Sequence, residues 1–379
     1  MIRVLHLITS LNRGGIETWL ISMLREIPRG KYQMDVCCKG TDIGPLASLA
    51  EQAGAKVISC PLGPAHVGFA AKLQRTLKEG KYDILHNHLE AYSGFPVWVA
   101  HQVQIPVITS FHNTHFGAQT SFTRLPIIRQ MRSVYSVISI GYALRNSELV
   151  TGCSQGVINS LDPDGKKLQT RSRILYYGVN IPELATDEES AQLRKSFGWE
   201  ADTPIILHVG RLIEQKNHLG LLSVFQRILE QVPTAKLLLV GTGPLQQMIE
   251  KSISQRGLSH AVRLLGARDD VPSLMSKCDI FLFPSIHEGF PMVALEANAS
   301  GLPVIGSRIP GLTEAVRDGE TGFLKEVGDI EGMAASAIAL IKDFSYAQQM
   351  KNSGRTWIED NYSTEVSAKR LLDIYNSFT

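Results

Sequence analysis

The sequence lacks the features that mark secreted, fibrous and membrane-spanning proteins. Its five cysteines are odd in number and form no C-x-x-C pair, which argues against a disulfide framework and a structural zinc site and favours a reducing, cytoplasmic compartment. No apolar run reaches the roughly 18 residues that a membrane-spanning helix requires, and the apolar start at residues 1–11 lacks the pattern of a signal peptide. No stretch is low in complexity or dominated by one charge. We therefore expect a soluble, globular chain.

Acidic residues are unevenly distributed along the chain. Residues 1–180 contain 19 Lys and Arg against 11 Asp and Glu, whereas residues 181–379 contain 19 against 25. Between Glu90 and Glu148 there is no acidic residue at all. A basic first half suits an anionic partner, and we expect no nucleic acid among the partners.

Short apolar runs alternate with longer helical patterns in two series. The first series comprises residues 3–7, 33–37, 56–59, 83–86, 106–110 and 149–151, and the second comprises residues 204–210, 236–241, 262–265, 279–284 and 303–306. This alternation predicts an α/β protein of two Rossmann-like domains, residues 1–177 and 178–361, each with a doubly wound parallel sheet. Gly, Asn and Pro break the periodicity at residues 174–182, where we expect the linker. Because parallel sheets bind ligands beyond the carboxyl ends of their strands, two such domains would line a cleft with these loops.

Two strand-to-helix loops have the composition of anion-binding sites. Gly14 and Gly15 follow the first strand and open a helix, where backbone N–H groups can receive an anion or a sugar; a tight turn explains them equally well. Gly210, Arg211 and Lys216 follow the first strand of the second domain. Fixed cations there would neutralise a diphosphate as its bond to a sugar breaks. Solvated surface cations are the alternative, but the position at a first Rossmann-like strand favours diphosphate binding.

Pairs of histidines end two strands of the first domain. His86 and His88 close one strand, and His112 and His115 follow another. Imidazole is suited to exchange protons or hydrogen bonds with hydroxyl groups near neutral pH. For each histidine taken singly, a hydrogen-bonded structural role is the more frequent alternative. No carboxylate accompanies these pairs as a metal site would require, and we expect no metal.

The run from residue 284 to residue 296, PSIHEGFPMVALE, is the most specific motif. Gly289 and Pro291 mark a junction of strand, loop and helix, with Glu288 in the loop and Glu296 about two turns into the helix. Two carboxylates there can accept hydrogen bonds from a ligand rich in hydroxyl groups, one at a sugar and one at a ribose. A helix-dipole partner and a surface glutamate would explain each residue alone, but not the whole string.

Together these motifs resemble those of the retaining GT-B glycosyltransferases of family 4, which carry an E-x7-E motif where this chain has Glu288 and Glu296. The resemblance covers nearly the entire chain, at residues 14–17, 86, 112, 210–216, 240–244, 288–296 and 318–324. It implies the GT-B fold, with two Rossmann-like domains facing a central cleft and a terminal helix, residues 362–379, that packs back on the first domain. One departure is Gly311, which stands alone where the family often has two adjacent glycines.

The resemblance also implies roles for particular residues. Arg211 and Lys216 would hold the diphosphate of the donor, Glu288 would touch the transferred sugar with His112 beneath it, and Glu296 would bind the ribose. We take His112, Arg211, Lys216 and Glu288 as the candidate catalytic groups. The other candidate donor contacts are Gly14, Gly15, Gly210, Gly289, Phe290, Pro291 and Met292. Residues 266–271 would lie beside the nucleobase.

The reaction implied is transfer of a sugar from a nucleotide-sugar to a hydroxyl group of a saccharide or lipid-linked acceptor, with retention and without a metal cofactor. A UDP-sugar is the first expectation for the donor and a GDP-sugar the second. A nucleotide-sugar epimerase or hydrolase on the same scaffold, and a non-catalytic two-lobed sugar-binding protein, are the alternatives. The D-x-D spelling at residues 162–164 lies in a Pro/Gly loop far from these motifs and is interpreted as a turn.

A helical pattern at residues 121–140 is both apolar and basic. One stripe holds Ile127, Met131, Val134 and Ile138, and another side holds Arg124, Arg129 and Arg132. A stripe that faces the core, with solvated arginines opposite, is the simple alternative. The acid-free gap favours contact with an anionic membrane surface, at the inner face of the cell membrane, or with a lipid-phosphate-linked acceptor.

Overall fold

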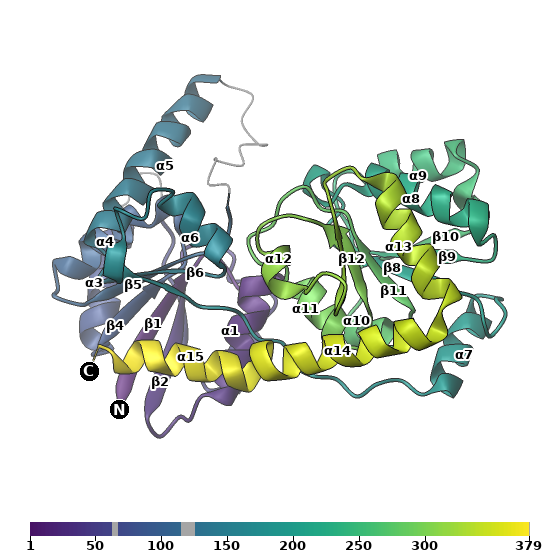
Figure 1. Ribbon diagram of the computed structural model, residues 1–379. Helices are drawn as coiled ribbons and strands as arrows, with labels where there is room; N and C mark the ends of the chain where they lie inside the picture. The colour runs from purple at the N-terminus through teal and green to yellow at the C-terminus, as the bar shows by residue number, and fades with distance from the viewer. Residues whose placement is uncertain (63–66, 115–125, 379) are drawn as a thin grey trace. The chain divides into compact units, whose positions relative to one another are not determined.

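The computed structural model describes residues 1–62, 67–114 and 126–378, and only the backbone of residues 67 and 126–129 among them. The chain forms two compact units (Figure 1). Unit 1 comprises Met1–Tyr177 and Ser367–Thr379, and unit 2 comprises Gly178–Val366. The chain thus leaves unit 1 after Tyr177 and returns to it at Ser367, whereas the sequence analysis places that return at residue 362.

Unit 1 is built on a seven-stranded parallel sheet in the order β3-β2-β1-β4-β5-β6-β7. The strands are β1 (Ile2–Ile8), β2 (Tyr32–Cys38), β3 (Val57–Ser59), β4 (Ile84–Asn87), β5 (Val107–Phe111), β6 (Leu149–Gly152) and β7 (Ser172–Ile174). The first six are the predicted strands, whereas β7 was not predicted because three residues carry too little apolar pattern. The strand order reverses beside β1, and in sheets of this type the carboxyl ends at such a point frame the ligand site.

The two faces of this sheet differ in polarity. Its helices are α1 (Gly15–Glu26), α2 (Ala47–Gln52), α3 (Val67–Glu79), α4 (Gly94–His101), α5 (Pro126–Asn146), α6 (Gln155–Leu161) and α15 (Thr364–Asn376). Leu5, Leu7 and Leu85 form an apolar core with α3 and α4 on one face. Because successive strand residues alternate between faces, His6 and His86, which lie opposite each other in register on β1 and β4, point to the other face. This polar face is covered in part by α15, drawn in yellow in Figure 1.

Unit 2 is built on a six-stranded parallel sheet in the order β10-β9-β8-β11-β12-β13. The strands are β8 (Ile205–Val209), β9 (Lys236–Val240), β10 (Val262–Gly266), β11 (Ile280–Phe283), β12 (Val304–Ser307) and β13 (Gly322–Lys325). The helices are α7 (Asp187–Ser196), α8 (His218–Gln231), α9 (Gln246–Gln255), α10 (Val271–Met275), α11 (Met292–Ala299), α12 (Leu312–Ala315), α13 (Ile330–Lys342) and α14 (Phe344–Tyr362). The five predicted strands are present, and β13 is additional. Strands buried on both faces, such as β11, read as continuous apolar runs, which is why their sequences identify them.

The D-x-D spelling at residues 162–164 forms a turn, as the sequence analysis expects. The Asp162 carboxylate accepts hydrogen bonds from the backbone N–H groups of Lys166, Lys167 and Leu168, at 3.1, 2.9 and 2.8 Å. These three bonds stabilise the charged carboxylate, and they lower the pKa of Asp162.

Helix α5 does not turn its apolar stripe to the core, so the simple alternative for that stripe is wrong. Met131, Val134 and Ile138 are 67%, 54% and 66% exposed. The helix packs instead through small side chains: Ser139 is buried, its hydroxyl accepts a hydrogen bond from the Gly94 N–H of α4 at 2.9 Å, and its backbone lies against Gly94. Arg132 is exposed, whereas Arg124 and His115, together with the side chains of residues 127 and 129, lie outside the described residues. Within the part of the chain that the structure describes, no helix has the length and apolar character needed to cross a bilayer.

Candidate functional site

In unit 2, the loops that follow β8 and β11 are joined by three hydrogen bonds. The Gln215 side chain donates to the carbonyl oxygen of His287 at 2.8 Å, and the Ile286 N–H donates to the carbonyl oxygen of Gln215 at 2.9 Å. Asn217 adopts a left-handed conformation, with φ of 52°, and donates to the carbonyl oxygen of Pro284 at 3.2 Å. Its side-chain oxygen also caps α8 by accepting from the Gly220 N–H. Lys216, between Gln215 and Asn217, is thereby held against the Glu288 loop.

Lys216 and Glu288, which the sequence analysis selects separately, form an ion pair. The Lys216 Nζ atom lies 2.6 Å from Glu288 Oε1, and the two side chains are 13% and 10% exposed. The ammonium group also lies 4.8 Å from the ring centre of Phe283. Two charges this deeply buried are tolerated because each compensates the other.

Arg211, five residues before Lys216, takes no part in this ion pair. Its side chain is exposed and makes no hydrogen bond or ion pair with any described residue. The preceding backbone is fixed by the glycines of the 240–244 motif. A Cβ atom at Gly241, where φ is 135°, would overlap the Gly210 carbonyl oxygen, and one at Gly243 would lie 2.5 Å from the Leu212 carbonyl oxygen. The two glycines therefore let the β9 loop pack directly on the loop that carries Arg211.

Residues 289–292 form the junction that the sequence predicts. Helix α11 begins at Met292 with Pro291 as its N-cap, and Glu296 lies within it, half-buried. Burial raises the pKa of the Glu296 carboxyl group, which makes no hydrogen bond with any described residue. The Phe290 ring packs 5.5 Å from that of Tyr362. Gly311, with φ of 82°, approaches the Gly289 carbonyl so closely that a Cβ atom would overlap it.

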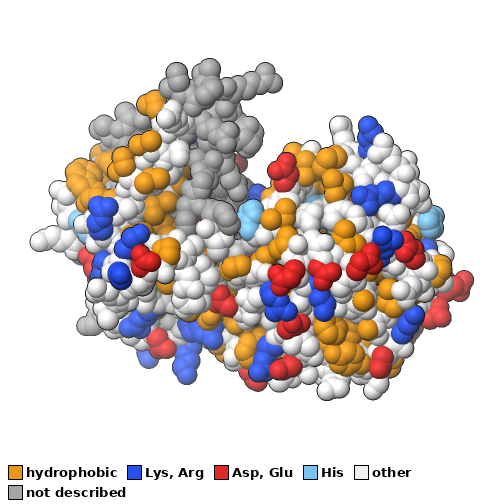
Figure 2. All heavy atoms as spheres, turned by 45° about the horizontal axis from the view of Figure 1, so that its top comes forward, with side chains coloured by type: hydrophobic (Ala, Val, Ile, Leu, Met, Phe, Trp, Pro, Cys, Tyr) orange, Lys and Arg blue, Asp and Glu red, His pale blue; other side chains and the backbone are white. Residues whose placement is uncertain are grey.

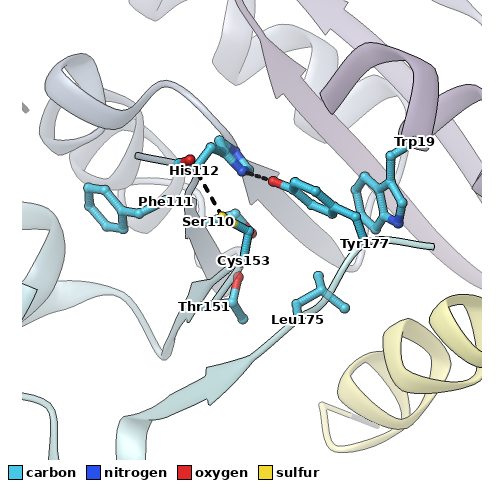
Figure 3. A pocket seen from close by; sticks show the side chains of 8 residues that line it. All are labelled: Trp19, Ser110, Phe111, His112, Thr151, Cys153, Leu175 and Tyr177. Carbon is cyan, nitrogen blue, oxygen red and sulfur yellow. Dashed lines mark hydrogen bonds between the residues drawn. The ribbon is translucent and has the colours of Figure 1, made fainter. Parts of the chain in front are cut away.

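In unit 1, His112 follows β5 with all four of its polar atoms engaged. Its N–H donates to Glu90 Oε1 at 2.8 Å, and its carbonyl oxygen accepts from the Cys153 thiol at 3.4 Å. Ring atom Nδ1 hydrogen-bonds to the Tyr177 hydroxyl group, as Figure 3 shows, and Nε2 lies 3.2 Å from His88 Nδ1. The surrounding side chains leave no space for a water molecule, and burial lowers the pKa of His112 to about 3. The ring is therefore neutral and fixed.

Glu90, Tyr177 and His6 are further residues around His112 that the motifs do not identify. Glu90 has φ of 46°, which is unusual for a residue other than glycine, and its carboxylate also accepts from the Asn113 side chain at 3.0 Å. Glu90 is the last acidic residue before the acid-free gap, and this position in the sequence could have identified it as a candidate site residue. His6 interrupts the apolar run of residues 4–8 in β1, and a polar residue inside such a run is a second signal.

Gly14 and Gly15 open α1 as predicted, with Gly14 as the N-cap. A Cβ atom at Gly14 would overlap the Glu17 carboxylate, so this side chain lies over the start of the helix. A carboxylate is the charge that a helix N-terminus favours. The predicted residues thus form two sets: Gly14, Gly15 and His112 belong to unit 1, and the residues from Gly210 to Glu296 belong to unit 2.

Comparisons with known proteins agree with this architecture. Residues 13–182 match the family model described as Glycosyltransferase Family 4, and residues 189–357 match that described as Glycosyl transferases group 1. The N-acetyl-alpha-D-glucosaminyl L-malate synthase of Bacillus anthracis is 29% identical over 82% of this chain and 79% of its own. The UDP-Gal:alpha-D-GlcNAc-diphosphoundecaprenol alpha-1,3-galactosyltransferase of Escherichia coli is 24% identical over 99% and 96%.

Solved structures show the same fold. The crystal structure of HepE from Anabaena in complex with UDP-glucose has a TM-score of 0.81 and 21% identity, with 100% of both chains covered. The two family models together span both units, and the strand orders are those of two doubly wound sheets. The protein is therefore an enzyme, a glycosyltransferase of the two-domain GT-B fold that belongs to family 4.

Proposed function

We propose that the enzyme transfers a sugar from a UDP-sugar to a hydroxyl group of a saccharide or lipid-linked acceptor, with retention at the anomeric carbon, in polysaccharide or glycolipid biosynthesis. A GDP-sugar is the second candidate for the donor. The names of relatives support the first: one is a galactosyltransferase that uses UDP-Gal, and the HepE structure contains UDP-glucose. The observation that carries the proposal is the buried ion pair between Lys216 and Glu288, with the exposed Arg211 five residues before Lys216 on the same loop.

The ion pair is poised to exchange partners. In the free protein Lys216 and Glu288 neutralise each other, so the site is stable without ligand. A diphosphate that reaches Arg211 competes for the ammonium group of Lys216, and the Glu288 carboxylate becomes available to the hydroxyl groups of the sugar. His112 of unit 1 contributes a neutral ring to the sugar's surroundings, and Glu296 accepts from the ribose.

The chemical step needs stabilisation of negative charge on the leaving group. The bond between the anomeric carbon and the diphosphate oxygen breaks with its electrons going to the diphosphate, where Arg211 and Lys216 stabilise the charge. The acceptor oxygen attacks the anomeric carbon from the same face, and its proton passes to the departing phosphate oxygen. The two cations supply the positive charge that a metal would otherwise provide, so we propose that no metal is required.

A thermal-shift panel of UDP-sugars and GDP-sugars tests the donor assignment. A ligand at one hundred times its dissociation constant adds about 2.7 kcal/mol to the free energy of unfolding. The shift should disappear in an Arg211→Ala/Lys216→Ala double variant and persist in Arg227→Ala, a matched control in which an exposed arginine of α8 loses its ion pairs with Glu230 and Glu331. The absence of a shift with every nucleotide-sugar would reject the proposal. Turnover without any acceptor would indicate a hydrolase or epimerase instead.

We also propose that α5 contacts an anionic membrane surface that presents a lipid-phosphate-linked acceptor. Four apolar side chains of the helix, Met131, Val134, Val137 and Ile138, are more than half exposed, and hydrophobic side chains gather beside the grey residues in Figure 2. The exposed Arg132 and the absence of any acid from residue 91 to residue 147 make the surrounding sequence basic. Each basic residue near such a surface contributes roughly 1 kcal/mol. The diphosphoundecaprenol in the name of the Escherichia coli relative is consistent with an acceptor of this class.

Sedimentation with anionic vesicles tests the membrane contact. Wild-type protein should sediment at low salt, and an Arg124→Ala/Arg129→Ala/Arg132→Ala variant should remain in solution. Arg145→Ala, at the other end of α5, is the matched control. Equal behaviour of the triple variant and the wild type would show that this face does not bind membranes.

A further inference from the structure

The polar face of the unit 1 sheet carries a row of buried, hydrogen-bonded side chains that the proposed reaction does not use. His6 and His86 lie opposite each other in register on β1 and β4, and His88 follows β4. The His88 ring lies nearly parallel to the other two, with its centre 4.2 Å from that of His86 and 5.3 Å from that of His6, whereas the His6 and His86 rings are tilted by 34°. All three side chains are at most 6% exposed. A set of imidazoles so deeply buried requires a partner for each ring nitrogen.

Those partners form one continuous chain. From His112, the path runs from Nε2 to His88 Nδ1 at 3.2 Å and from His88 Nε2 to His6 Nδ1 at 3.1 Å. It continues from His6 Nε2 to the Tyr375 hydroxyl group at 3.0 Å, and from that hydroxyl to His86 Nδ1 at 2.8 Å. At the other end, Tyr177 closes the chain on His112 Nδ1. His112, His88 and His6 thus lie in series between Tyr177 and Tyr375.

A metal ion does not explain this cluster. His6, His86 and His88 offer ligand atoms within 4.8 Å of one another. Every nitrogen of the three rings, however, has a hydrogen-bond partner already. The arrangement is that of a hydrogen-bonded relay.

The relay has only two arrangements of its protons. A neutral imidazole donates through one nitrogen and accepts through the other. If His112 donates through Nε2, then His88 accepts at Nδ1 and must donate through Nε2, and His6 must do the same. If His6 instead donates through Nδ1, then His88 accepts at Nε2 and donates through Nδ1, and His112 accepts at Nε2. His6, His88 and His112 therefore share one tautomer, and the hydroxyl groups of Tyr177 and Tyr375, each able to donate or accept, bond the nitrogens at the two ends of the relay.

The two tyrosines lie on the segments by which the chain leaves unit 1 and returns to it. Tyr177 is the last residue of unit 1 before unit 2 begins, and Tyr375 lies on the helix by which the chain returns. Ser367, the first residue of that return, accepts from the Trp19 indole N–H at 2.9 Å and donates to the Tyr176 carbonyl oxygen at 3.0 Å. Through Ser367, α15 is therefore hydrogen-bonded to the segment that ends at Tyr177. The partner of His6 Nε2 is thus supplied by α15.

We propose that Tyr177 and Tyr375 are positioning residues for transfer, which fix the tautomer and the ring plane of His112 through His88 and His6. This inference rests on the proposed function, in which His112 adjoins the transferred sugar. A neutral, fixed ring suits that place because the sugar gains positive charge as the glycosidic bond breaks, and a protonated imidazole would oppose it. The seating of α15 then determines whether the sugar site is ready.

Long-range hydrogen–nitrogen NMR spectra of the wild-type protein test the relay without any variant. The spectra distinguish the two neutral tautomers of each histidine, and single His→Gln substitutions assign the signals. His6, His88 and His112 should show the same tautomer. A mixture, with one ring protonated on Nδ1 and its neighbour on Nε2, would overturn the proposal.

A matched pair of tyrosine variants tests the link to transfer. Tyr375→Phe removes the hydroxyl group between His6 and His86, whereas Tyr32→Phe removes a hydroxyl group that binds the same helix through Asn376, at 2.5 Å, outside the relay. UDP release from UDP-glucose, UDP-N-acetylglucosamine and UDP-galactose is the assay. We expect Tyr375→Phe to mix the tautomers of His112 and to lower kcat by roughly 10- to 100-fold with little change in KM. Tyr32→Phe should change neither quantity.

The outcomes separate this inference from the proposed function. Equal losses of kcat in Tyr375→Phe and Tyr32→Phe would show that only the docking of α15 matters, and the relay would be rejected. A His112→Ala variant with wild-type kcat would reject the role of His112 itself, whatever the spectra show. If Tyr375→Phe does not fold, Tyr177→Phe interrupts the other end of the relay and should give the same mixing and the same loss.

Discussion

Acidification should unfold unit 1 because four histidines are buried in it without charge. His6, His86, His88 and His112 are each at most 7% exposed. Burial lowers the pKa of His6 and His112 to about 3 and holds that of His86 and His88 well below the usual value. In the unfolded chain each histidine titrates near pH 6.5. The stabilisation is therefore complete above about pH 6.5 and is lost progressively as the pH falls toward the folded-state pKa.

The size of the effect follows from the difference in proton binding. At pH 5 a histidine that stays neutral in the folded protein is about 1.5 pH units below its unfolded-state pKa, which removes about 2 kcal/mol at 1.36 kcal/mol per unit. His6 and His112 together remove about 4 kcal/mol, a large part of the stability of a typical domain, about 5–15 kcal/mol, and His86 and His88 act in the same direction. Unit 2 has two comparable residues, His208 and His218, whose pKa values are lowered to about 3 and about 4 by burial. Unit 1 should therefore unfold first.

Chemical denaturation at half-unit steps from pH 7.5 to pH 4.5 measures this dependence. Trp19 reports on unit 1 when the other three tryptophans are replaced by phenylalanine. His6→Gln removes one titrating group and should reduce the slope of the unfolding free energy against pH by about 1.4 kcal/mol per unit. His260→Gln, at an exposed histidine of unit 2, is the control. An unfolding free energy that is constant from pH 7 to pH 5, or an unchanged slope in His6→Gln, would refute the reasoning.

Four further predictions concern unit 2 and the activity. Glu288→Gln should lower kcat by about 100- to 1,000-fold, since one well-placed electrostatic contact lowers the activation barrier by about 2.7–4 kcal/mol. In the same assay, the wild-type enzyme should keep its activity in excess EDTA. Lys216→Ala should lower the free energy of unfolding by about 3–5 kcal/mol, because it leaves Glu288 buried and unpaired. Arg211→Ala, at an exposed residue, should change that free energy by no more than about 0.5 kcal/mol. Equal losses for the two variants in urea titrations would contradict the ion-pair geometry. Gly241→Ala should lower the free energy of unfolding by more than about 4 kcal/mol, because the added Cβ atom would overlap the Gly210 carbonyl oxygen. A melting temperature equal to that of the wild type would show that the close packing of these two loops is not required.

The sequence predicts those features that are encoded locally. The strands are recognisable because each buried parallel strand is a short apolar run, and the Glu288 loop is recognisable because its glycine, proline and glutamates lie within nine residues of one another. The pairing of Lys216 with Glu288 was not predicted, since 72 residues separate them and only the packing of β8 beside β11 brings them together. The removal of Lys216 therefore carries a cost that an exposed cation would not.

Other features depend on the register of distant strands. The histidine relay draws on β1, β4, β5 and α15, and no periodic pattern in the sequence relates His6 to Tyr375. The interpretation of the α5 stripe as a possible core face assumed that apolar residues are the ones that pack. Ser139 packs instead because Gly94 allows the two backbones to approach, and polarity alone did not reveal it.

The interrupted course of unit 1 along the chain has a consequence for synthesis on the ribosome. Residues 367–378 are made only after all of unit 2, yet they supply the buried side chains of Leu371, Ile374 and Tyr375. Until then the nascent first half carries an uncovered polar face, on which His6 and His86 lack the hydroxyl group that joins them. Unit 2 has no such gap, because its residues are consecutive. We therefore expect that unit 2 can complete its fold during translation before unit 1, which lacks α15 until residues 367–378 are made.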